Sequence, residues 1–256
     1  MKKKALLLAP TLALGLGLAA FASTPAFAAD SGSSYQAQLG ALNHSGASGT
    51  ATVQISGDQA TVHLQASGLA STFNGGAFPH VAHIHIGAQH TCPPASADKN
   101  GDGVVSTPEA ASYYGSIGTT LTSSGSTGAD QALNVKVPAI SGSSGTYERT
   151  FTINAATKAA LSANTAVVVV HGLNPSSLSA KAQKEKSPLS ASLPLAATAP
   201  ALCGALVSSQ MAMPAGGAET GGGPAPIQTG MLALGGGLVI AAGGALVARR
   251  RITGSR

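Results

Sequence analysis

The histidines of this chain are concentrated in one short segment. Four of its seven histidines fall within residues 80–90, which read HVAHIHIGAQH. Alternate side chains of a β-strand share a face, so His83 and His85 would lie together while Ala82 and Ile84 point into the core. An H-x-H pair on a strand can supply two imidazoles to copper or zinc. The spacing therefore predicts a metal site at His83 and His85.

The other histidines suit such a site to different degrees. His171 directly follows the apolar run 166–170, so it stands at the end of an expected core strand and is a third candidate ligand. His80 has the wrong parity unless the chain bends before the strand, and His90 lies in the following loop; both are further candidates. The alternative is that the histidines are surface residues with hydrogen bonds of their own. We favour that alternative for His44 and His63.

A second set of metal-binding residues follows the histidines. Residues 98–109 read DKNGDGVVSTPE and match the calcium-loop pattern D-x-[DN]-x-[DN]-G-x5-E at every specified position. A helix should begin near Pro108, but the prolines at 93 and 94 exclude a helix before the loop. The alternative is an acidic turn without an ion. The expected calcium ligands are the side chains of Asp98, Asn100, Asp102 and Glu109, the carbonyl of Val104, and Ser106 directly or through water.

The elements that must position these residues are β-strands. Residues 49–68 alternate apolar and polar side chains on both sides of a Gly57-Asp58 turn, which is typical of a hairpin with one buried face. Only 108–114 and 154–162 have a helical pattern. About eight strands joined by Gly/Ser-rich turns predict an all-β fold, a Greek-key β-sandwich or flattened barrel. The further expected strands are 35–39, 81–86, 134–138, 147–153, 166–170 and about 202–206.

The two ends of the sequence indicate export and anchoring. A basic start, an apolar stretch and the sequence Ala26-Phe27-Ala28 predict a secretory signal over residues 1–28. Residues 231–248 form an apolar run of about 27 Å as a helix, and the arginines at 249–251 follow it. We therefore expect an exported protein at the cell surface, with a membrane span at 231–248 and a cytoplasmic tail at 249–256.

Between the folded domain, expected over residues 29–210, and the span lies a Gly/Pro-rich stalk, residues 211–230. This tail resembles the wall-sorting signals that sortases cut at a Thr-Gly bond, which would make a sortase and the cell wall partners. The matching bond is Thr220-Gly221, although a glycine replaces the leading leucine of the motif; Thr229-Gly230 is a second candidate. A plain single-span membrane anchor is the alternative.

The charge of the chain does not point to nucleic acid. The formal charge is +5, but seven of the fourteen basic residues lie in the signal or the tail. All nine acidic residues lie in the exported part, whose charge is therefore 7 − 9 = −2. The basic balance reflects membrane topology, so we expect no nucleic-acid partner.

The chain has only two cysteines, Cys92 and Cys203. An exported protein folds in an oxidising space, so we expect them to form a disulfide; two free thiols are the alternative. Because the two cysteines are about 111 residues apart, a bridge would lower the conformational entropy of the unfolded chain and so stabilise the fold by roughly 4–5 kcal/mol. Such a bridge would help a core that has no tryptophan.

Four features occur in an order that resembles copper/zinc superoxide dismutases: His83-Ile84-His85, a cysteine soon after, a valine-rich strand ending in His171, and Leu202-Cys203-Gly204. Residues 44–69, followed by AHIHIG, also resemble the related chordin-type (CHRD) domain. The resemblance covers residues 34–206. It implies copper binding by the H-x-H pair and His171, and a disulfide between the two cysteines.

The sequence departs from the dismutase pattern in two places. No histidine lies between Cys92 and His171, so the zinc loop has no match, and the position of the active-site arginine holds Pro200. We therefore expect an extracellular metal-binding domain without efficient catalysis and assign no catalytic residue. A copper-only superoxide dismutase is one alternative function. An adhesive or interaction module without a transition metal is another.

Overall fold

The structure, a computed structural model, describes residues 32–209 of the chain. The predicted signal (1–28), stalk (211–230) with Thr220-Gly221, membrane span (231–248) and tail (249–256) lie outside these residues. Within residues 32–209, none of the helices combines the length and the apolar character needed to cross a bilayer.

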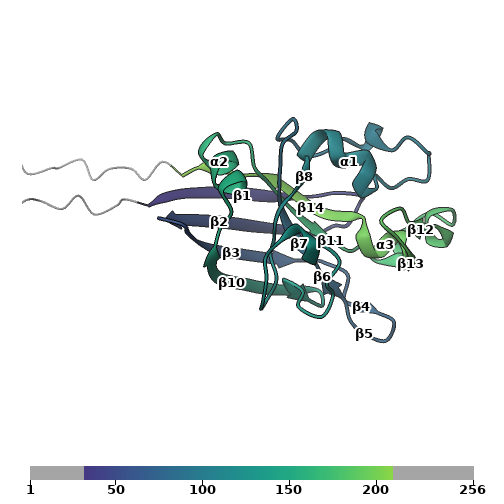
Figure 1. The fold of residues 1–256 in the computed structure, drawn as a ribbon. Coiled ribbons are helices and arrows are strands. Elements are labelled where there is room, and N and C mark those ends of the chain that lie inside the picture. The colour runs from purple at the N-terminus through teal and green to yellow at the C-terminus, as the bar shows by residue number, and fades with distance from the viewer. Residues whose placement is uncertain (1–31, 210–256) are drawn as a thin grey trace, which may run out of the picture. The chain divides into compact units, whose positions relative to one another are not determined.

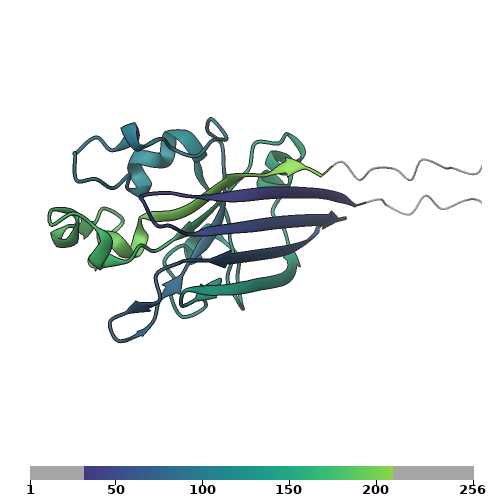
Figure 2. The same ribbon diagram turned by 180° about the vertical axis from the view of Figure 1, so that it is seen from behind.

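Eight antiparallel strands form one curled sheet, a half-barrel that makes the fold mostly β (Figure 1). The short β15 pairs with β1 beside this path. Seen from behind, the long strands β1, β2, β3 and β10 form one side of the sheet (Figure 2). In spatial order the strands are β10 (Ser144–Thr152), β3 (Gln59–Ser67), β2 (Ser48–Ser56), β1 (Ser33–Ala41), β14 (Pro200–Ala205), β11 (Val167–His171), β7 (Ala82–Ile86) and β8 (Ser116–Thr120), with β15 at Val207–Ser208.

The sequence pattern of the first hairpin is confirmed. Ser56 pairs with Gln59 across a two-residue turn, and the apolar side chains of β2 and β3 are buried while their polar neighbours are exposed or half-buried. The same alternation buries Tyr35, Ala37 and Leu39 of β1. The predicted dry face therefore exists and is the inner face of the curled sheet.

The sheet is covered on both faces in the region of β7 and β11. Ala82, Ile84, Val168 and Val170 belong to the large inner core. The intervening Val167 and Val169 belong to a second, smaller cluster with Tyr114 of α1 and Cys203. An all-apolar strand is expected when both faces are buried, and the four consecutive valines of β11 satisfy this requirement.

Two helices begin where the sequence predicts. Helix α1 (Thr107–Tyr114) starts with a capping box in which the Ser106 and Glu109 side chains each bond the other residue's backbone N–H. Helix α2 (Ala155–Ser162) is capped by Asn154, which accepts a hydrogen bond from Thr157 N. The remaining elements are short: α3 (Leu195–Thr198), the 3₁₀ turns at Ala95–Ala97, Ala129–Gln131, Pro175–Ser177 and Ala182–Lys184, and the strands β4 (Thr72–Phe73), β5 (Gly76–Ala77), β6 (Pro79–His80), β9 (Ile140–Ser141), β12 (Lys186–Ser187) and β13 (Ser190–Pro194).

One predicted strand is wrong. Residues 134–138 form consecutive turns, in which Asn134 N bonds Gln131 O and Val137 N bonds Asn134 O. Val135, which an inward-facing strand position would bury, is 46% exposed. Pro138 also lacks the N–H that a strand ladder needs. Strand β8 takes a sheet position that the small polar sequence SIGTT did not reveal.

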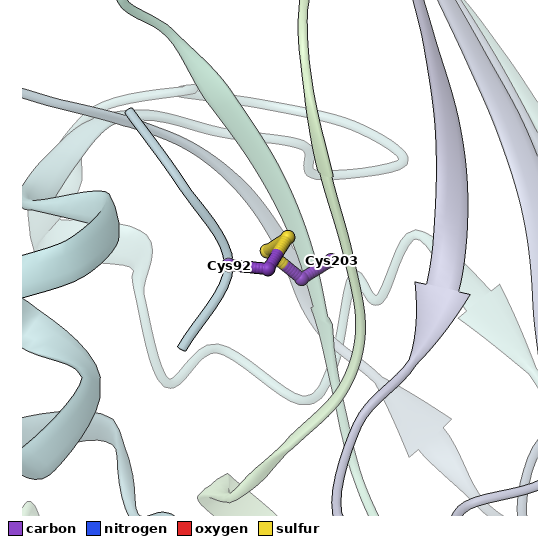
Figure 3. The surroundings of a disulfide bond; sticks show 2 residues. All are labelled: Cys92 and Cys203. Carbon is purple, nitrogen blue, oxygen red and sulfur yellow. A yellow bond between two sulfur atoms is a disulfide. The ribbon is translucent and has the colours of Figure 1, made fainter. Parts of the chain in front are cut away.

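The disulfide is confirmed. Cys92, in the loop before α1, is bonded to Cys203 on β14, with the two Cα atoms 5.7 Å apart (Figure 3). Strand β14 lies between β1 and β11, so the bridge ties the covering loop to the middle of the sheet. This fixes the layer that lies over the histidines.

Candidate metal centre

Three buried imidazoles meet on the covered outer face of the sheet. His83 and His85 lie on β7, where they pair with Val169 and Val167 of the neighbouring β11. His171 ends β11, on the same face. The ring centres are 4.9 Å apart for His83 and His171, 5.5 Å for His83 and His85, and 6.1 Å for His85 and His171. One ring nitrogen from each lies within 4.8 Å of those of the others.

Each ring is oriented by a backbone carbonyl. A carbonyl oxygen only accepts hydrogen bonds, so the ring nitrogen facing it must carry the proton, and the other nitrogen of a neutral ring keeps its lone pair. Such partners are the usual way in which proteins fix the tautomer of a metal-binding histidine. The bonds are His83 Nε2 to Ala132 O (3.1 Å), His85 Nδ1 to Gly115 O (2.9 Å) and His171 Nδ1 to Thr198 O (2.7 Å).

The remaining nitrogens, His83 Nδ1, His85 Nε2 and His171 Nε2, are buried and have no hydrogen-bond partner. The three side chains are 3%, 1% and 2% exposed, so little of each ring is in contact with solvent. An unpaired buried polar atom costs about 1–3 kcal/mol. One cation between them would satisfy all three lone pairs, so this cluster is a candidate metal centre.

Burial keeps these rings uncharged. It lowers the pKa of His171 to about 4, and burial together with repulsion from His171 lowers the pKa of His85 to about 3. Burial and repulsion from the other two rings hold the pKa of His83 well below its usual value. Neutral imidazole is the form that binds metals, so no proton has to leave the site at neutral pH.

The cluster fits a small transition-metal ion. Three nitrogens bound at about 2.0–2.1 Å to one ion at tetrahedral angles lie roughly 3.3–3.4 Å from one another. Separations of up to 4.8 Å would therefore have to shorten by as much as about 1.4 Å when the ion binds. Among residues 32–209, no cysteine or carboxylate joins the three histidines. Three protein ligands leave a fourth position of the ion open to an outside molecule, as in catalytic rather than structural sites.

The structure does not bring His80 and His90 into this group. His80 lies on β6, where its ring is stacked on Phe78 and both its nitrogens face carbonyls, of Ala70 and of His171. His90 Nδ1 faces the carbonyl of Thr165 at 3.2 Å. His80 thus supports the backbone of a ligand residue, and we leave both out of the ligand set. His44 and His63 are exposed.

Residues 98–109 form a compact loop that enters α1. The Asp98 carboxylate accepts hydrogen bonds from Gly101 N (2.8 Å) and Gly103 N (2.9 Å). The Glu109 carboxylate turns back to Lys99 N and to Ser106. Unlike the three histidines, the carboxylates of Asp98, Asp102 and Glu109 do not converge as a group.

Two residues outside the predicted loop lie against it. The Lys181 ammonium donates to Asn100 O, and Glu185 lies beside Asp102 and Asn100. Hydrogen bonding to Asp102, with some desolvation and charge repulsion, raises the pKa of Glu185. A carboxylate pair of this kind marks a locally negative site. Residues 181 and 185 are far from the loop in the sequence and belong to no motif that includes it, so the sequence did not predict this contact.

Sequence reasoning also missed the residues that hold and cover the histidines. Three of them, Ala132, Gly115 and Thr198, act through backbone carbonyls, which every residue type has. Tyr114 of α1 packs on His85 with ring centres 4.4 Å apart. Gly115 is the one partner with a visible requirement: at φ +87° a Cβ would collide with the Ile86 carbonyl oxygen.

No protein-family model matches this chain, and the comparison with curated proteins finds no match either.

Proposed function

We propose that this chain is an exported, envelope-anchored β-domain that binds one copper or zinc ion through His83, His85 and His171. The observation that carries the proposal is the set of three bare, buried ring nitrogens, each fixed by a carbonyl on the far side of its ring. Three neutral imidazoles suit copper and zinc better than calcium or magnesium, which prefer oxygen.

The proposal includes a Greek-key arrangement related to the superoxide dismutase and CHRD domains. Its support is the combination of a curled antiparallel sheet, an H-x-H strand beside a strand that ends in histidine, and a disulfide to the last long strand. The disulfide also favours an oxidising compartment. Mass spectrometry of the mature protein tests export and anchoring: cleavage after Ala28 is expected, and a chain uncut there would contradict export. Cleavage after Thr220 or Thr229 would establish wall attachment, whereas a mature protein that keeps its C-terminal residues would favour the plain membrane anchor.

Isothermal titration with zinc and with copper tests metal binding. The purified protein should bind one equivalent, and the His83→Ala/His85→Ala variant should bind at least a hundredfold more weakly because one imidazole remains. The His44→Ala/His63→Ala variant is the matched control, since it removes two exposed histidines and should bind like the wild type. A wild-type protein that binds neither metal would favour the adhesive module.

Superoxide dismutation at a copper-only site is the second candidate function. The open fourth position of the ion favours it, because superoxide must reach the copper. However, none of the residues lining the pocket above the histidines is a lysine or arginine that would attract an anion. The copper-loaded protein is expected to remove superoxide no faster than a copper-histidine peptide. A rate tenfold above the peptide would establish the enzyme.

We further propose that the loop 98–109 takes up calcium and acts as a structural staple. The carboxylate pair of Asp102 and Glu185 and the ready-folded loop support it. Calcium would require Glu109 to turn from Ser106 toward the ion. Millimolar calcium should raise the melting temperature relative to a chelator, and Asp98→Asn/Asp102→Asn should abolish the difference. Equal melting temperatures in the wild type would exclude a filled loop.

A further inference from the structure

A pocket of about 490 Å³ lies directly above the three histidines. Helix α1 forms one wall with Pro108 and Ala111, and strand β8 contributes Ile117. Leu133, after the 3₁₀ turn at 129–131, and Leu189, between β12 and β13, complete it. In Figure 1, α1 and the β12–β13 region lie at the same end of the molecule, beyond β7 and β11. The volume is that of a site for a small organic molecule.

The lining of the pocket is uncharged, and its buried hydroxyls already have partners. No aspartate, glutamate, lysine or arginine lines it. Thr107 Oγ1 donates to Thr198 O (2.8 Å), and Thr198 Oγ1 is bonded to Ser187 Oγ (2.6 Å). The buried side-chain atoms of the lining that lack a partner are therefore the ring nitrogens of the three histidines.

The outer wall of the pocket is apolar although solvent reaches it. Within residues 32–209, four large apolar side chains are exposed, and two of these line this one pocket: Leu133, 37% exposed, and Leu189, 44% exposed. Exposed apolar groups that gather at one hollow indicate a binding site. A ligand that covers them gains free energy by burying apolar area.

Resting on the proposed metal site, we infer that this pocket binds a small organic molecule with one metal-binding donor atom and an otherwise apolar body. The donor occupies the open position of the ion held by His83, His85 and His171. The apolar body lies against Leu133, Leu189 and the α1 wall. A charged group on the body of the ligand would have no partner in the lining, so its burial would be costly. The pocket therefore selects a ligand by the shape and polarity of its body, and the metal selects it by its donor atom.

Cobalt-loaded protein and three pyridines with nearly the same donor nitrogen test this inference. Co²⁺ bound by histidines absorbs visible light, and its bands change when a new ligand coordinates it. Because a phenyl group buries apolar area, 4-phenylpyridine should bind at least about tenfold more tightly than pyridine. Pyridine-4-carboxylate should bind no more tightly than pyridine. The Leu133→Ser/Leu189→Ser variant should lose the preference for 4-phenylpyridine but keep its cobalt spectrum.

The control variant Val207→Ser removes an exposed apolar side chain outside the pocket and should keep the preference. Equal affinity of the wild type for pyridine and 4-phenylpyridine, or an unchanged preference in the double leucine variant, would overturn the inference while leaving the metal site intact. Cobalt bands that are absent, or that persist unchanged in His83→Ala/His85→Ala, would instead overturn the metal site and this inference together.

Discussion

At the scale of single residues, the state of three ring nitrogens determines what this site can do. In most buried histidines both ring nitrogens have a hydrogen-bond partner, which is either a protein group or an ordered water molecule. Here the protonated nitrogens of His83, His85 and His171 have carbonyl partners, whereas the other nitrogens are buried without a partner in a cluster of three rings. That arrangement raises the free energy of the metal-free protein and lowers the cost of binding a cation.

The lowered pKa values predict how the metal-free protein responds to acid. A histidine in the unfolded chain has a pKa of about 6.5. Burial lowers the pKa of His171 to about 4, and burial with repulsion from His171 lowers the pKa of His85 to about 3. Between these values the unfolded chain binds more protons than the folded one. Stability is therefore fully present above pH 6.5 and falls as the pH decreases, by about 1.4 kcal/mol per unit for each ring.

Urea denaturation of the metal-free protein at pH 7.5, 6.5 and 5.5 measures this slope. The free energy of unfolding should fall slightly from pH 7.5 to 6.5 and about three times as much from pH 6.5 to 5.5. The His171→Asn variant should show a shallower decrease because one titrating ring is gone. A free energy of unfolding that does not change between pH 6.5 and 5.5 would show that the rings are charged or hydrated in the folded state.

Gly115 offers a test of the carbonyl that orients His85. In Gly115→Ala, the new Cβ would collide with the Ile86 carbonyl oxygen and displace the Gly115 carbonyl from His85 Nδ1. Loss of such an outer partner typically weakens metal binding about 10- to 100-fold. Gly87→Ala is the matched control, since Gly87 has the same φ of +87° but open space around its Cβ position. Equal zinc affinities of the two variants in calorimetry would refute this role.

At the scale of elements, the sequence predicted what depends on local pattern. Alternation located β1, β2 and β3. Pro108 at a helix start and the helical pattern of 154–162 located both longer helices. The parity of β7 correctly placed His83 and His85 on one face. His171 was a candidate because it follows an apolar run at the end of an expected strand, and the resemblance added that it joins the pair; the geometry brings the three rings together.

What the sequence could not predict is how the outer face is covered. Nothing in the residues of α1 or of the loop before it states that they pack over β7 and β11, because this packing joins segments distant in the chain. The same limit explains the missed strand β8, whose residues are held by pairing with β7 rather than by propensity. The pocket walls Leu133 and Leu189 come from two further segments, so no spacing links them.

The covering layer depends on the disulfide. Removing it with Cys92→Ser/Cys203→Ser should lower the free energy of unfolding by about 4 kcal/mol, because the bridge closes a loop of 111 residues. Denaturant titration measures the change, and the wild type under reducing conditions should show a comparable loss. A decrease below about 1 kcal/mol would mean that the packing of Tyr114 and the valines alone fixes the covering layer.

At the scale of the whole molecule, the sheet separates two tasks. Its inner face carries the large apolar core that determines the fold, and its outer face carries the small cluster, the disulfide and the histidines. The metal site is built on strands with a rigid core behind them, which suits precise coordination. Metal bound to the folded state alone must also stabilise the fold.

This coupling predicts a metal-dependent melting temperature. Free zinc at a hundred times its dissociation constant adds about 2.7 kcal/mol of stability. For a domain of this size, that corresponds to roughly 5–10 °C. Thermal denaturation followed by circular dichroism should show the increase in the wild type and in His44→Ala/His63→Ala, and not in His83→Ala/His85→Ala. An increase of equal size in all three proteins would place the zinc elsewhere.

Anomalous diffraction from crystals of the zinc-loaded or copper-loaded protein, measured at the absorption edge of the metal, tests the central claim most directly. We predict one strong peak bonded to His83 Nδ1, His85 Nε2 and His171 Nε2 at about 2.0–2.1 Å. Its fourth ligand should lie on the side of the pocket lined by Leu133 and Leu189. A metal bound elsewhere, or three rings that stay unbound while the crystals contain the metal, would contradict the account.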